Sequence, residues 1–168
     1  MSHQHLTASQ LQLHSLENST TTTAHKECTR HIKWGHLIQS LNSMGTAISH
    51  DCAFDYEETS LCDPHHLANM VDHDAILLVD IVKKTETMYK KNPNPKKFIE
   101  ALHHTHHTLS NCVHHSDNAE NEPVTTCFNK LEAFLKKKSQ SHCAWEIINA
   151  KVREVLQRLE KRSVRRRR

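Results

Sequence analysis

The sequence predicts an all-α fold of five helices in a single domain, and three observations lead to this prediction. Apolar residues recur at steps of three and four along most of the chain, which is the spacing of one helix face. No segment alternates apolar and polar residues as a half-buried strand would. The 168 residues are 36% apolar and 24% charged, which suffices for one core without a second domain.

The N-terminal part of this domain is expected to contain one helix and a long loop. Residues 1–25 are rich in Ser, Thr, Gln and His without apolar periodicity, so we expect a flexible segment there. A helical domain then covers residues 26–162. The first helix of this domain starts at Cys28, ends at Gly45 and carries an apolar stripe that includes Ile32. Residues 45–63 then form a loop.

Four further helices follow the loop. Asp63 before Pro64 is typical of a helix start, and this helix continues to a turn at residues 92–95. The next helix carries apolar residues from Phe98 to position 113, and another begins near Pro123 and ends at the lysines 136–138. Ser141 is the predicted cap of the last helix, which runs to about residue 162.

The loop lengths predict the topology. A long first connection permits parallel neighbours, whereas the short later turns require antiparallel ones. Together they predict a four-helix-bundle fold of the cytokine type. Residues 45–63 form its long A–B crossover loop, which joins the first predicted helix (A) to the second (B), and we call these residues the crossover loop. Trp34 and Trp145 both lie at helical spacing among apolar neighbours, so we expect them in the core.

The composition excludes several function classes. Gly35 and Gly45 are the only glycines, so neither a Gly-rich phosphate loop, a dinucleotide fingerprint nor a nucleophile elbow can be assembled. With 17 histidines, a Ser-His-Asp arrangement is uninformative, and we predict no enzyme and no cofactor. The longest apolar stretch, residues 75–79, is far too short to span a membrane.

The charge distribution predicts a basic tail on a slightly acidic body. The net charge is +3, but six Lys and Arg lie in residues 161–168, and without them it becomes −3. A nucleic-acid-binding domain would spread its basic residues over one face, so we expect no nucleic acid partner. The C-terminal segment 163–168 is instead expected to contact heparan-like polyanions.

Six cysteines without a C-x-x-C pair favour three disulfides over a zinc site. Disulfides indicate an oxidising compartment and therefore secretion, although the first fifteen residues show no signal peptide. Asn18 begins an Asn-Ser-Thr sequon, which is a candidate glycosylation site. The alternative is an intracellular protein with free thiols.

Four histidines in the run HHTHH, residues 103–107, have the i, i+3 and i, i+4 spacing that can chelate a divalent metal. The pattern requires no carboxylate or cysteine partner nearby, so we favour a solvated polar face and assign no metal site. A cytosolic His-rich protein that binds metal or a partner helix is the alternative function.

The last helix begins Cys-Ala-Trp-Glu at residues 143–146, and the third helix ends Leu-Ser-Asn-Cys at residues 109–112. In both features the sequence resembles the type I interferons, and the resemblance covers residues 28–162. It implies three disulfides in an avian-like arrangement, namely Cys28–Cys112, Cys52–Cys143 and Cys62–Cys127. Exchange of Cys52 with Cys62 is equally compatible with the spacing, because six cysteines allow 15 connectivities.

The resemblance also implies a function. Type I interferons are secreted antiviral cytokines that bridge two chains of a class II cytokine receptor and trigger JAK–STAT signalling. One chain contacts the crossover loop and the outer face of the last helix, and the other contacts the second to fourth helices. The implied contact positions on the last helix are Asn149, Ala150, Arg153 and Glu154. Family members often carry a basic residue where Asn149 stands; type III interferons and interleukin-10 relatives are the nearest alternatives.

Overall fold

The computed structural model describes residues 29–53, 62–73, 76–92, 95–112 and 121–167. Within these ranges the chain forms six α-helices and one 3-10 turn and contains no strand, which confirms the predicted all-α fold. The elements are α2 (Trp34–Asn42), η1 (His50–Cys52), α4 (Pro64–His73), α5 (Ile76–Tyr89), α6 (Lys96–Cys112), α7 (Glu122–Lys137) and α8 (His142–Arg167).

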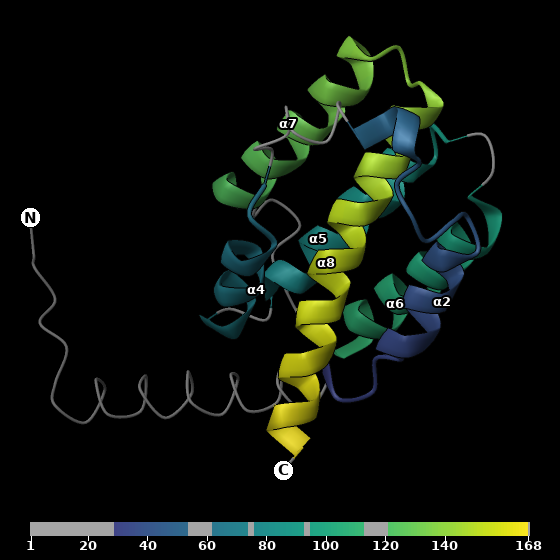
Figure 1. Cartoon of the computed structure of the whole chain (residues 1–168). Coiled ribbons are helices and arrows are strands. Elements are labelled where there is room, and N and C mark those ends of the chain that lie inside the picture. The colour runs from purple at the N-terminus through teal and green to yellow at the C-terminus, as the bar shows by residue number, and fades with distance from the viewer. Residues whose placement is uncertain (1–28, 54–61, 74–75, 93–94, 113–120, 168) are drawn as a thin grey trace, which may run out of the picture.

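Helix α8 runs through the middle of the molecule (Figure 1). In this view α2 and α6 lie to one side of it, α4 and α7 lie to the other, and α5 lies behind. Helices α2, α4 and α7 each pack against α8, while α5 packs against both α6 and α7. The last helix therefore contributes to the core and also borders most of the other elements.

Helix α2 runs antiparallel to α8. Arg153 of α8 contacts Asn42 at the end of α2, and Glu160, further along α8, lies beside Gly35 near the start of α2. Helix α5 also runs antiparallel to α8, because its last residue, Tyr89, contacts the first half of α8. Helices α2 and α5 are therefore parallel to each other, which the long crossover loop between them makes possible.

The core is a single cluster of apolar side chains from all six helices. Trp34 and Trp145 are both buried, which confirms the prediction that they are core residues. Tyr89 stacks edge-on against Phe98, with ring centroids 4.8 Å apart, and lies 5.4 Å from the Trp145 ring. Each of these aromatic side chains contributes several kcal/mol, on the order of 2 to 3, through removal of its apolar surface from water.

The helix boundaries differ from the predicted ones in three places. Helix α2 begins at Trp34, and Ile32 is buried from the turn that precedes the helix. The segment predicted as one helix between residues 63 and 92 comprises α4 and α5, and residues 74–75 lie outside the described ranges. Helix α8 continues to Arg167, so residues 163–167, predicted as a separate tail, are helical, and Ser163 is only 8% exposed.

Local hydrogen bonds explain where α7 ends and α8 begins. The Ser141 Oγ accepts the Ala144 N–H at 3.2 Å, which confirms the predicted N-cap of the last helix. After α7 the chain turns through Ser139 and Gln140, both with φ near +50°. The Ser139 N–H donates to the Lys136 carbonyl and the Gln140 N–H to the Leu135 carbonyl, the pattern of a Schellman motif.

Candidate functional site

Two disulfides fix the crossover loop to the helices. Cys52 in η1 is bonded to Cys143 in the first turn of α8, and Cys62, just before α4, is bonded to Cys127 of α7. These are the pairings that the resemblance implies, and the exchanged alternative is not found. The third implied pair includes Cys28, which lies outside the described residues, as do Asn18 and the N-terminal segment 1–25.

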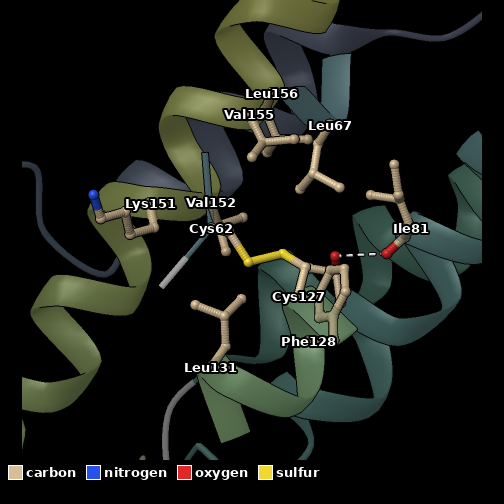
Figure 2. Close-up of a pocket in the computed structure, with 11 residues that line it drawn as sticks. Cys62, Leu67, Ile81, Cys127, Phe128, Leu131, Lys151, Val152, Val155 and Leu156 are labelled. Carbon is tan, nitrogen blue, oxygen red and sulfur yellow. Dashed lines mark hydrogen bonds between the residues drawn. A yellow bond between two sulfur atoms is a disulfide. The ribbon is translucent and has the colours of Figure 1, made fainter. Parts of the chain in front are cut away.

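The second of these disulfides lies against the core. Cys62 and Cys127 lie beside a small cavity of about 20 Å³, and Figure 2 shows the side chains that line it. Apolar side chains from α4, α5, α7 and α8 surround it, with Leu67, Ile81 and Val155 among them. Its lining is almost entirely apolar, so a water molecule there would have few hydrogen-bond partners. The Cys62–Cys127 disulfide therefore packs against the core and stabilises the fold. The Cys52–Cys143 disulfide instead holds the part of the loop that runs beside α8.

Besides the Cys52–Cys143 disulfide, Glu146 makes a second attachment between the loop and α8. Its Oε2 accepts the Ser49 N–H at 2.8 Å and its Oε1 accepts the Ser49 hydroxyl at 2.7 Å. The same Oε1 lies 2.7 Å from Nε2 of His142, one turn earlier on the helix. Partial burial raises the pKa of Glu146, but the two Ser49 hydrogen bonds and His142 outweigh it and hold the pKa below its ordinary value.

Arg153 makes the third attachment. Its Nε donates to Asn42 Oδ1 at 2.6 Å, and its Nη2 donates to the Gly45 carbonyl at 2.7 Å. Gly45 has φ of +117°, a conformation that favours glycine, so the chain leaves α2 in a sharp turn that the guanidinium spans. The Arg153 side chain, which is expected to contact the receptor, is thus bonded to the end of α2 and the start of the loop.

The four expected contact residues do not share one environment. Ala150, Arg153 and Glu154 are half-buried on the surface of α8. Asn149 is only 6% exposed, and its Oδ1 accepts the Tyr89 hydroxyl at 2.6 Å. This corrects the expectation that Asn149 lies on the outer face of the helix. Its amide is turned inward because it pairs with the hydroxyl of a fully buried tyrosine.

One comparison with known proteins identifies the family. The family model described as the interferon alpha/beta domain matches residues 29–164, which is most of the chain. The chain belongs to the alpha/beta interferon family. Comparison with curated proteins and with solved structures gave no match. Because the match is to the alpha/beta domain, it favours type I interferons over the type III and interleukin-10 alternatives.

Family membership shows that the protein is a cytokine. The alpha/beta interferons are secreted cytokines that bind class II cytokine receptors, and they are not enzymes. No helix in the described part of the chain is long and apolar enough to cross a membrane. The matched region contains α2 to α7 and nearly all of α8, so the disulfide-bonded crossover loop and its contacts with α8 lie within the interferon domain.

Sequence reasoning missed the role of Glu146, which it placed on the polar face of the last helix. A signal was nevertheless present. Glu146 lies three residues after Cys143 on the same helix face, and Ser49 lies three residues before Cys52. If the loop runs antiparallel to the helix from that disulfide, these two residues meet. No comparable signal marks Asn42 and Gly45 as partners of Arg153.

The histidines of the HHTHH run lie on α6. His103, His104 and His107 are exposed, and Nδ1 of His103 lies 3.2 Å from Oε1 of Glu86 on α5. Within the described ranges, no three His, Cys, Asp or Glu side chains lie close enough together to hold a metal ion. The two disulfides and the family match both favour the cytokine over the cytosolic metal-binding alternative.

Proposed function

We propose that this interferon is a secreted antiviral cytokine that bridges two chains of a class II cytokine receptor and thereby triggers JAK–STAT signalling. The observation that carries the proposal is the family match over residues 29–164. The structure supports the proposal with a surface that a receptor chain could bind. In this surface the crossover loop is attached to α8 by a disulfide and by two side chains.

The first interface is the crossover loop together with the half-buried residues Ala150 and Glu154 of α8, and Arg153 lies beside them with its guanidinium bonded to Asn42 and Gly45. A loop already fixed in place loses little conformational freedom when a receptor binds it, which reduces the entropic cost of association. The second interface is the outer face of α4 to α7, on the other side of the bundle. Two separate surfaces on one rigid core allow one molecule to hold two receptor chains together.

The experiment that tests this proposal blocks each interface separately. Ala150→Arg places a bulky cation on the first interface, and Lys130→Glu reverses an exposed charge on α7 within the second. Binding to each receptor ectodomain of the host is measured by surface plasmon resonance, and STAT phosphorylation is measured in host cells. We expect the first variant to lose one receptor chain and keep the other, the second variant to do the reverse, and both to signal weakly.

Two results contradict the proposal. One is a folded parent protein that binds neither ectodomain. The other is STAT phosphorylation that persists in cells lacking either receptor chain, because a bridging ligand needs both.

A weaker interaction with heparan-like polyanions is proposed for residues 161–168, which carry six positive charges in eight residues. Such binding is electrostatic and therefore falls steeply with salt. A variant with residues 165–168 replaced by alanine keeps the buried Ser163 and should leave a heparin column at lower salt than the parent. Removal of two charges from α7, Lys136→Ala with Lys137→Ala, is the control. Unchanged elution of the 165–168 variant contradicts the assignment.

A further inference from the structure

Three attachments between the first part of the crossover loop and α8 follow one another in order. Along α8 they occur at Cys143, Glu146 and Arg153, and their partners along the chain occur in the reverse order, at residues 52, 49 and 45 to 42. Steps of three and seven residues keep these α8 side chains on one helix face. The loop therefore runs antiparallel along a single face of α8.

The Arg153 attachment depends on the shape of its side chain. A guanidinium has several N–H donors in a fixed planar fork, so it can hold two acceptors at once. Here those acceptors are the Asn42 amide oxygen and the Gly45 carbonyl, which belong to the end of α2 and the first loop turn. A lysine at this position keeps the charge but holds both acceptors poorly.

The Glu146 attachment depends on charge and on two oxygens. Both carboxylate oxygens accept hydrogen bonds from the same loop residue, one from the Ser49 backbone and one from its hydroxyl. Hydrogen bonds to an ionised acceptor are roughly twice as strong as neutral ones. Ser49 itself is exposed, so its position depends on this carboxylate more than on burial.

We infer that Arg153 and Glu146 are positioning residues, which hold residues 42–53 in the conformation that the receptor chain binds. The inference rests on the proposed function for its receptor, and it assigns these two side chains a role that acts through the loop. If the loop is released, only a fraction of molecules presents the bound conformation, and the apparent affinity falls by that fraction.

The test combines amide hydrogen exchange with receptor binding. The variants are Arg153→Lys and Glu146→Gln on α8 and Ser49→Ala on the loop; Arg158→Lys, at an exposed α8 position, is the matched control. We expect exchange in residues 43–53 to accelerate about tenfold in Arg153→Lys and Glu146→Gln, with a loss of receptor affinity of similar or smaller size. Circular dichroism melts establish that each variant is folded. Ser49→Ala removes the hydroxyl hydrogen bond to Glu146, keeps the backbone one, and leaves α8 unaltered.

The outcomes separate positioning from direct contact. Lower affinity with unchanged exchange in residues 43–53 overturns the inference, because the side chains would then act by touching the receptor. Faster exchange with unchanged affinity also overturns it, since loop order would not matter for binding. Failure of the proposed function is distinguishable: the parent protein would bind neither receptor chain, while the exchange difference between parent and Arg153→Lys would persist.

Discussion

Tyr89 is completely buried and yet carries a hydroxyl, which donates to the buried Asn149 amide oxygen. Burial raises the pKa of Tyr89 well above its ordinary value and outweighs the opposite effect of Arg153, so the phenol stays neutral. We predict that Tyr89→Phe lowers the free energy of unfolding by about 1 to 3 kcal/mol, because it leaves the Asn149 oxygen buried without this partner. Urea denaturation of both proteins measures the difference.

The control for this prediction also removes the Asn149 amide oxygen, which Tyr89→Phe leaves without its hydrogen-bond donor. Adding Asn149→Ala to Tyr89→Phe should cost much less than Asn149→Ala costs in the parent, because the two side chains act as a pair. Strictly additive losses would contradict the importance assigned to the hydrogen bond.

Glu146 makes a pH-dependent contribution to stability. Its pKa is lowered in the folded protein, so folding favours the ionised form. The contribution is therefore fully present above the unfolded-state pKa of about 4.3 and is lost as the pH falls through the lower folded-state pKa. We predict that the stability difference between the parent and Glu146→Gln is largest near neutral pH and shrinks below pH of about 4. Denaturant unfolding at several pH values measures it, and a pH-independent difference contradicts it.

At the scale of the elements, the turn between α7 and α8 contains strain that a single substitution relieves. Ser139 occupies the position after the α7 C-cap with φ of +53°, where glycine is strongly preferred. We predict that Ser139→Gly raises the free energy of unfolding by about 0.5 to 1 kcal/mol, because an L-residue pays a steric penalty in this conformation. Thermal unfolding checks the gain. Ser139→Ala, which keeps a Cβ, should show none.

Much of the element structure could be predicted because its signals are local. Helical spacing of apolar residues predicted α6, α7 and α8, and Ser141 was identified as a cap from its place before the last helix. The start of α2 was predicted too early because Ile32 fits the apolar stripe but is buried from the preceding turn. Periodicity reports which residues are buried, and it cannot tell a helix from a turn that buries the same side chain.

The candidate site was less predictable because its contacts join residues far apart in the chain. Asn149 was placed on the outer face by counting along the helix, but its direction is decided by Tyr89, sixty residues earlier. Arg153 was identified as a functional residue, but its bonds to Asn42 and Gly45 depend on how the crossover loop lies on α8. Such long-range register becomes visible only when the helices are packed together.

At the scale of the whole molecule, the two described disulfides have different roles: Cys62–Cys127 mainly stabilises the fold, and Cys52–Cys143 mainly holds the proposed binding surface. They close segments of similar length, with sequence separations of 91 and 65 residues. In the loop-entropy account each therefore contributes a similar stabilisation, on the order of 4 to 5 kcal/mol. Their surroundings differ, because Cys62–Cys127 borders an apolar core cavity and Cys52–Cys143 ends the series of contacts between the loop and α8.

This difference predicts opposite consequences of removing each bond. Replacing Cys62 and Cys127 by alanine should destabilise the protein more, because the cavity beside them enlarges, while affinity for the receptor stays close to that of the parent. Replacing Cys52 and Cys143 by alanine should lower receptor affinity roughly tenfold in protein that is still folded, since the released loop then samples other conformations. Denaturant unfolding and plasmon resonance on both double variants, below their melting temperatures, measure the two effects. Equal losses of affinity in the two would show that the part of the crossover loop held by Cys52–Cys143 matters no more for receptor binding than the end held by Cys62–Cys127.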